Sequence, residues 1–213
     1  MNKQIPTQKI TWILTGAVWI AAIGLYATMP ERMATHWNAM GEADGHSGKL
    51  FGLFLVPLVM TAIQMLFAVL PKMDPLKSNS TIFKKQFEEF ALLFAVFMAY
   101  LFGAILVWNK GVVFSMTTAL VPAFAVLFYG IGILLHEVKR NWFMGIRTPW
   151  TMSSDVVWDK THALGSKLFK ACGLIILLGF LFPQYVIGLI LIPIIISTIW
   201  TVLYSYLIFK KEK

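Results

Sequence analysis

The sequence predicts an all-α protein that crosses a membrane six times. Of its 213 residues, 58% are hydrophobic and only 13% are charged, whereas charged residues make up about a quarter of a typical soluble domain. Long uncharged stretches lie at 50–70, 90–109, 111–135 and 171–209, and a helix needs roughly 20 apolar residues to cross a bilayer. These observations argue against a water-soluble globular domain.

The first three predicted spans are separated by polar segments. The first covers residues 10–29, and its apolar region exceeds the roughly 7–15 residues that are typical of a cleaved signal peptide. The second covers 50–70 and ends at Pro71, and the third covers 86–108 after the polar linker 72–85. We therefore expect an uncleaved first span that is followed by an outer loop.

The last three spans require a division of the longest apolar run. The fourth span covers 111–135 after a tight turn. The run 171–209 would be about 58 Å long as one helix, nearly twice the thickness of the hydrocarbon core. The segment 183–185 contains a proline and is the natural break, so we expect a fifth span that begins near Ser166 and a sixth over 186–209.

Lysine and arginine residues fall mainly on one side of these spans. Fifteen of the 18 lie in the two tails, the linker 72–85 and the segment 139–170, whereas Arg32, Lys49 and Lys110 lie on the other side. The positive-inside rule therefore places both termini in the cytoplasm. The net charge of +8 is mainly a topology signal, and attraction to anionic lipids explains it better than direct binding of nucleic acid.

The spans group into two predicted domains. Residues 1–75 form a two-span unit with the extracellular loop 30–49, and residues 76–213 form a four-span unit with the cytoplasmic segment 136–167. Binding residues concentrate on loops that a rigid scaffold positions. These two polar segments are therefore the candidate functional regions.

The extracellular loop concentrates ligand-binding side chains between glycines. His36, Trp37, Asn38, Gly41 and Asp44 lie within nine positions. A structural turn network is the simplest interpretation. Alternatively, the loop recognises an extracellular ligand, with Trp37 as the apolar anchor and Asn38 and Asp44 as polar contacts. The spacing of the loop histidines matches no standard metal-ligand pattern, so we predict no metal site.

The cytoplasmic segment predicts a helix at the inner membrane interface. The proline that follows Thr148 favours an extended conformation there, and a serine pair followed by Asp155 is typical of a helix start. Apolar positions then recur at helical spacing between 157 and 168, which indicates an amphipathic helix before the fifth span. Three tryptophans fit the aromatic belt of a membrane interface, namely Trp142, Trp150 and Trp158.

This segment closely resembles the signature of the Sdp immunity protein (SdpI) family of bacterial membrane proteins. The resemblance rests on Arg140, Asn141, Gly145, Ile146, Arg147, Thr148, Pro149, Trp150, Thr151, Ser154, Val157, Trp158, Thr161, His162 and Gly165. All of these except Ile146, Val157 and Gly165 are our candidate partner-binding or structural residues. The extracellular loop resembles the family's short N-terminal domain through Pro30, His36, Trp37, Asn38, Gly41, Asp44 and Gly45. One departure is Ala163, where the family often has a basic residue.

The resemblance implies an immunity function in a bacterial plasma membrane. The family's founding member protects a Bacillus cell from its own secreted toxic peptide, which damages the membrane, and recruits a cytoplasmic repressor. The resemblance therefore implies a toxic peptide as the extracellular partner and a transcriptional repressor as the cytoplasmic partner, with the lipid bilayer around the spans. The resemblance also implies a role in signal transduction and toxin resistance.

Motifs of common enzymes are missing from the sequence. It contains no Gly-rich phosphate loop, no His-Glu-x-x-His and no Gly-x-Ser-x-Gly. Its single cysteine, Cys172, has no partner in the chain for a disulfide. No Asp, Glu, Lys or Arg is expected at mid-membrane, which argues against a proton-coupled pump. We therefore predict a non-enzymatic protein that uses no cofactor.

Transport of a small molecule or peptide is the alternative function. Pro57, Pro122 and Pro193 fall at similar depths in the second, fourth and sixth spans, and kinks at that level would open a cavity near the polar residues 115–118. Proline is also tolerated in spans through local rearrangement, which is the simpler interpretation.

Overall fold

Six long helices run side by side in the computed structural model, which describes residues 6–75 and 80–212, the side chains of 80–83 excepted. Each is long and apolar enough to cross a membrane, so the predicted all-α polytopic class is confirmed. The six helices are α1 (Thr7–Leu25), α2 (Lys49–Met73), α3 (Ser80–Asn109), α5 (Val121–Glu137), α7 (Asp155–Ile176) and α8 (Val186–Glu212).

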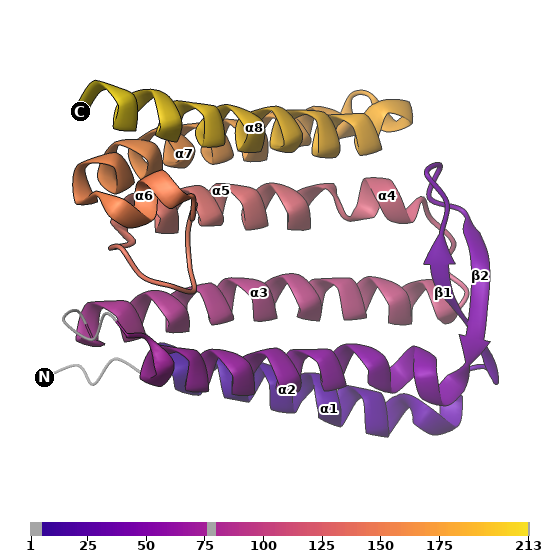
Figure 1. Ribbon diagram of the computed structural model, residues 1–213. Helices are drawn as coiled ribbons and strands as arrows, with labels where there is room; N and C mark the ends of the chain where they lie inside the picture. Colours follow the sequence, from indigo (N-terminus) through magenta and orange to yellow (C-terminus); the bar gives the residue numbers. More distant parts are fainter. Residues whose placement is uncertain (1–5, 76–79, 213) are drawn as a thin grey trace, which may run out of the picture.

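Shorter elements occupy the two ends of this bundle. A β-hairpin closes one end, which we call the hairpin end, and both termini lie at the other, the terminal end (Figure 1). The shorter elements are the strands β1 (Arg32–Trp37) and β2 (Ala43–Gly48), the helices α4 (Met116–Ala119) and α6 (Pro149–Ser153), and 3-10 turns at Tyr26–Thr28, Leu177–Phe180 and Pro183–Tyr185.

Two predicted boundaries differ from the structure. The fifth span begins at Asp155 and not near Ser166, so residues 155–165 are the first part of α7 rather than a separate interfacial helix. The Ser154 side chain accepts a hydrogen bond from the backbone N–H of Val157 (3.3 Å) and starts the helix there. Pro71 lies inside α2 instead of ending it.

The fourth span also departs from the prediction at its proline. Pro122 lies in the first turn of α5, where its missing N–H has no helical partner to lose. It therefore starts a helix and does not kink one. Pro57 and Pro193 do lie inside α2 and α8.

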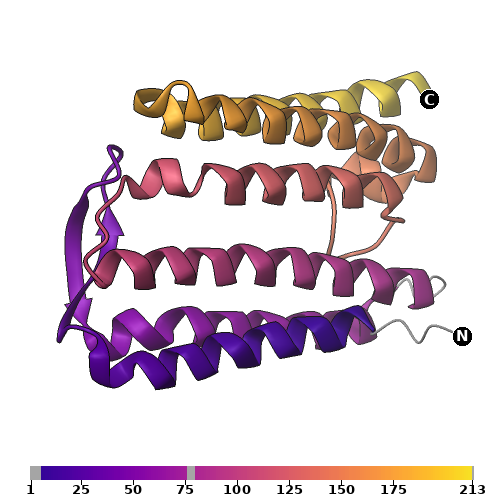
Figure 2. The same cartoon turned by 180° about the vertical axis from the view of Figure 1, so that it is seen from behind.

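The helices pack as two groups of three. One core forms among α1, α2 and α3, and a second forms among α5, α7 and α8. Seen from behind, the indigo helix α1 covers α2 (Figure 2). The two groups meet through α3 and α5, where the Phe97 and Phe124 rings lie 5.1 Å apart. This grouping describes packing only, and the domain boundary near residue 75 stays a prediction.

Glycines allow α5 and α7 to approach closely. A Cβ on Gly132 would lie 2.7 Å from the backbone nitrogen of Lys170, and one on Gly173 would lie 2.7 Å from the carbonyl oxygen of Ala125. Small residues at such contacts are typical of membrane helices, because packing rather than the hydrophobic effect holds them together. The α5–α7 pair is thus a rigid support for the segment that connects the two helices.

The extracellular loop of the prediction forms an antiparallel hairpin. Arg32 pairs with Gly48 and Met33 pairs with Ser47, and the register shifts beyond Ala34. Met33 and Ala34 are fully buried, so β1 presses onto the ends of the helices. The hairpin is the one part of the described chain that forms strands.

Candidate functional sites

The hairpin presents one exposed charged pair. The Nδ1 atom of His36 lies 2.5 Å from Oδ1 of Asp44 on the opposite strand, and the two side chains are 72% and 45% exposed. The structure therefore brings these two predicted ligand-binding residues together. Their hydrogen-bonding groups face solvent beside the exposed tip residue Met40.

The other predicted residues of the loop serve its fold. Asn38 closes the turn, because its Oδ1 accepts hydrogen bonds from the backbone N–H groups of Met40 (2.9 Å) and Glu42 (3.0 Å). Trp37 is turned inward and packs edge-on against Trp108, with the ring centroids 5.8 Å apart. The structure thus favours the turn-network interpretation for Asn38 and a packing role for Trp37.

Gly41 fixes the hairpin tip to the second helix group. Its φ of +82° lies in the region that glycine adopts at no steric cost. Its carbonyl accepts a hydrogen bond from the N–H of Met116 (3.0 Å), and Ser115 Oγ donates to the carbonyl of Met40 (3.1 Å). A Cβ at Gly41 would collide with Ser115 Oγ and lie 2.8 Å from the nitrogen of Met116.

The base of the hairpin is fixed to the first helix group. The Asn109 side chain accepts from the N–H of Ala34 (2.7 Å) and donates to its carbonyl (3.1 Å). Lys49 forms an ion pair with Glu31 at 2.6 Å. Because its base and tip rest on different groups, the hairpin bridges the two halves of the protein.

An apolar groove of about 390 Å³ lies beneath this bridge. Its lining comes from β1 and from α2, α3, α4, α5 and α8, and includes Thr35, His36, Trp37, Val59, Leu101, Thr117, Phe124 and Ile190. The groove reaches Met116 and Thr117, but Pro57, Pro122 and Pro193 do not line it, so a cavity opened by proline kinks stays a prediction.

At the terminal end, the segment between α5 and α7 folds around a stacked pair of rings. Trp158 and His162 lie on one face of α7 with ring centroids 4.0 Å apart and planes at 18°. His162 Nε2 accepts a hydrogen bond from the N–H of Ile146 (2.9 Å), so Nδ1 carries the proton and donates to the carbonyl of Trp158 (2.8 Å). Trp158 Nε1 donates to the carbonyl of Val138 (2.8 Å). The pair therefore ties both ends of residues 138–146 to α7.

Two further predicted residues shape this loop from within. Asn141 is 1% exposed, and its amide accepts from Phe143 and Met144 and donates to Lys139 and Met144 over 2.6–3.0 Å. Gly145 has a φ of +106°, and a Cβ there would collide with His162 Nε2. Both residues are therefore structural.

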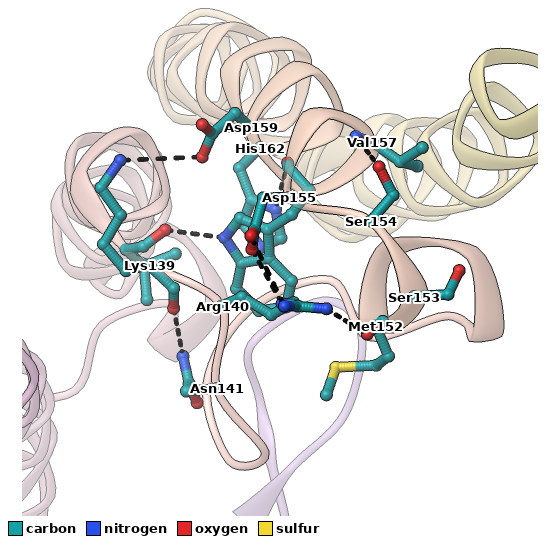
Figure 3. Close-up of polar contacts among 12 residues, drawn as sticks. Lys139, Arg140, Asn141, Met152, Ser153, Ser154, Asp155, Val157, Asp159 and His162 are labelled. Carbon is teal, nitrogen blue, oxygen red and sulfur yellow. Dashed lines mark hydrogen bonds and ion pairs between the residues drawn. The ribbon is translucent and has the colours of Figure 1, made fainter. Parts of the chain in front are cut away.

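Charged side chains fix the solvent-exposed side of this segment to the start of α7. Arg140 Nε lies 2.8 Å from Asp155 Oδ1, and its NH1 donates to the carbonyl of Met152 (2.7 Å). Figure 3 shows Arg140 between these two partners, with Lys139 reaching Asp159 beside them. The arginine thus links the start of the segment to the start of α7.

The short helix α6 fixes the segment to the end of α8. Thr148 and Thr151 cap each other reciprocally, and Thr148 Oγ1 lies 3.0 Å from Ser205 Oγ. The Trp150 ring packs 5.1 Å from that of Tyr206, and Ser154 hydrogen-bonds to Glu212 in the same region. Thr161 is fully buried on the inner face of α7.

A small part of the predicted motif remains accessible. Arg147 and Pro149 are exposed and, with Trp142 and Met152, line an open depression of about 600 Å³. Trp142 is 50% exposed. Among the described residues, Arg147 makes no ion pair with a carboxylate; its guanidinium donates to the carbonyl of Trp142.

Sequence reasoning missed partners that lie far away in the chain. The buried carboxylate of Asp74 accepts a hydrogen bond from the N–H of Trp142 (3.0 Å) and joins α2 to the segment 136–167. Asn109 and Ser205 act similarly on the hairpin and on α6. In the sequence, each of these residues is recognisable only as a lone polar residue near the end of a span. That position suggests a polar contact but does not identify the residue with which it is made. Within the described residues, His, Cys, Asp and Glu side chains form no group of three that could hold a metal ion.

Comparisons with known proteins match both regions. Residues 137–205 match the SdpI/YfhL protein family, and residues 13–61 match a domain of unknown function, DUF1648. The chain is 25% identical over 203 residues to Immunity protein SdpI of Bacillus subtilis (strain 168), covering 95% of each chain. No solved structure matches the chain.

The predicted resemblance to the SdpI family is thereby confirmed. The two matched ranges contain the two regions described above, since the first includes α6, α7 and most of α8 and the second includes the hairpin. Six spans and a similar immunity protein support a multi-pass membrane protein with an immunity role.

Proposed function

We propose that this chain, a relative of the SdpI family, protects a bacterial cell by intercepting a secreted, membrane-active toxic peptide at the hairpin end. The observation that carries the proposal is similarity to an immunity protein over nearly the whole chain. The exposed His36–Asp44 pair supplies the polar contacts, and Met40, 66% exposed, supplies an apolar one. We infer binding rather than catalysis.

The proposed orientation follows from charge. The hairpin end carries Arg32, Lys49 and Lys110, and most other lysines and arginines of the sequence lie toward the terminal end. For a bacterial plasma membrane, the positive-inside rule then places the hairpin outside the cell and both termini in the cytoplasm. A toxin that approaches from outside therefore meets the hairpin first.

The test is survival of a toxin-sensitive bacterium that lacks its own immunity gene. Cells that express this chain are exposed to the secreted toxic peptide of the family's founding member. We expect protection by the wild type and loss of protection by the double variant His36→Ala, Asp44→Ala. The matched control is His46→Ala, an exposed histidine on the same hairpin. Full sensitivity of cells with abundant, membrane-inserted wild type would overturn the proposal.

Recruitment of a cytoplasmic transcriptional repressor is a second candidate function. The open depression that contains Trp142, Arg147, Pro149 and Met152 favours it, because exposed arginine and aromatic side chains are the usual anchors of protein interfaces. Trp158, Thr161 and His162 are buried and would act by supporting that surface. This role is compatible with the first one, since it uses the opposite end of the protein.

A further inference from the structure

The groove beneath the hairpin has one polar end and an apolar interior. Thr35, His36 and Thr117 lie at the hairpin end, whereas side chains such as Val59 and Phe124 line the deeper part. A buried water typically makes about three hydrogen bonds, and cavities lined by hydrocarbon stay dry. The groove therefore suits an apolar occupant that carries a polar group at the hairpin end.

The edge of the groove faces the surrounding membrane. Leu55 of α2 and Ile187 of α8 line it, and each is 39% exposed on a helix that is long and apolar enough to span a bilayer. In Figure 1, α8 lies above the α3–α5 pair and α2 lies below it, and residues of both helices line the groove. An occupant that enters between α2 and α8 comes from the hydrocarbon layer, not from water.

Trp37 lines the groove at its hairpin end. Tryptophan rings favour the interfacial level of a bilayer, and the ester groups of a phospholipid lie at that level, between its polar head and its chains. The ester region of a bound lipid is therefore expected beside Trp37.

We propose that the groove binds one acyl chain of a phospholipid from the leaflet around the hairpin end, with the ester region beside Trp37 and the headgroup near His36. Because lipid chains are as apolar as the groove, transfer gains no hydrophobic free energy. The favourable contribution comes from dispersion contacts in a space that would otherwise be empty. This site shares His36 with the toxin contact proposed above but does not depend on it, because its test involves no toxin.

Photolabelling of the full-length protein tests this site without any toxin. The purified chain is placed in vesicles of phosphatidylglycerol and phosphatidylethanolamine that contain a phospholipid with a diazirine in one chain, and labelled residues are mapped by mass spectrometry. Ile190 lines the groove and is 7% exposed, whereas its neighbour Leu191 is 51% exposed. We expect Ile190 to be labelled at least as strongly as Leu191, although simple exposure to lipid predicts the reverse.

A variant that fills the groove is compared with a control variant that fills a different cavity. Val59→Trp places an indole in the groove, and Val126→Trp places one in a separate cavity of about 220 Å³ between α3 and α5. We expect about a tenfold loss of labelling at Ile190 in the first variant, which corresponds to about 1.4 kcal/mol of binding free energy, and no loss in the second. Both variants must elute and unfold like the wild type.

Two outcomes would overturn the proposal. One is labelling at Ile190 that stays far below that at Leu191 in the wild-type protein, a readout that needs no variant. The other is labelling of Ile190 by a diazirine-bearing helical peptide of leucine and alanine that displaces the phospholipid, because the groove would then be a site for a peptide.

Discussion

The hairpin and the segment 136–167 are fixed to the helices in opposite ways. The segment 136–167 uses buried side chains, such as Asn141 and His162, whose polar atoms are bound within the segment and α7. The hairpin is held mainly through its backbone, at Ala34 and Gly41, and leaves the side chains of His36 and Asp44 free for solvent. A motif rich in candidate binding residues can therefore be largely buried. The hairpin, which has fewer such residues, exposes polar side chains to solvent.

This difference predicts where substitutions will damage the fold and where they will damage binding. Changes inside the segment 136–167 should lower stability, because each one leaves buried groups without partners. Changes on the outer surface of the hairpin should alter toxin protection at nearly unchanged stability. Four predictions test this division, and matched controls accompany three of them.

The largest effect is expected for Gly145→Ala. Alanine is strained at a φ of +106°, and its Cβ would displace the His162 ring from the N–H of Ile146. We expect a loss of about 3 kcal/mol, which lowers the midpoint of thermal unfolding by about 6–12 °C for a chain of this length. The control is Gly103→Ala, where a Cβ meets nothing within 4 Å. Equal midpoints for both variants in detergent would contradict the internal role of Gly145.

His162→Ala should have the next largest effect. The substitution removes a ring that is 2% exposed and leaves the N–H of Ile146 without its acceptor. The carbonyl of Trp158 loses the Nδ1 donor but keeps its bond within α7. An unsatisfied buried group costs about 1–3 kcal/mol, so we expect a loss of about 2–3 kcal/mol. His136→Ala, at an exposed histidine, is the control. The same thermal measurement would refute the prediction if His136→Ala were the more damaging change.

The spans were predictable because hydrophobicity over about 20 residues decides membrane insertion. The helix start at Asp155 was predicted, but its continuation into the fifth span was missed, since the continuous helix that follows the cap at Ser154 outweighs the polarity of residues 155–165. The strands were missed because β2, Ala43–Gly48, has two internal or terminal glycines and little β propensity. Its pairing depends on contacts such as Ala34 with Asn109, 75 residues away.

The candidate sites were predictable as segments but not as surfaces. The sequence placed His36 and Asp44 in one loop, and the hairpin register brings them together. It gave no means of separating Arg147, which is exposed, from Asn141, which is buried. That distinction depends on the fold of residues 138–154 around Trp158, with Asp74 of α2 as a distant partner.

Gly41→Ala should loosen the hairpin without unfolding the helices. The new Cβ meets Ser115 and Met116 at a backbone angle that disfavours alanine, so the tip should detach at a local cost of about 1–3 kcal/mol. We expect faster amide hydrogen exchange at residues 38–48, with unchanged exchange in α5 and α7. Unchanged exchange in the hairpin would show that the tip contact does not hold it in place.

The smallest difference in stability separates two arginines of the same segment. Arg140 is bound to Asp155 and to the carbonyl of Met152, and since Asp155 is largely exposed, Arg140→Ala should cost about 1 kcal/mol. Arg147 is exposed and forms no ion pair within the described part of the chain, so Arg147→Ala should change stability by less than about 0.5 kcal/mol. If the depression recruits a repressor, however, Arg147→Ala should release a fluorescently tagged repressor from the membrane, whereas Arg140→Lys should retain it. If Arg147→Ala and Arg140→Lys both retain the repressor at equal expression, Arg147 is not part of the contact. The depression then has only a structural role.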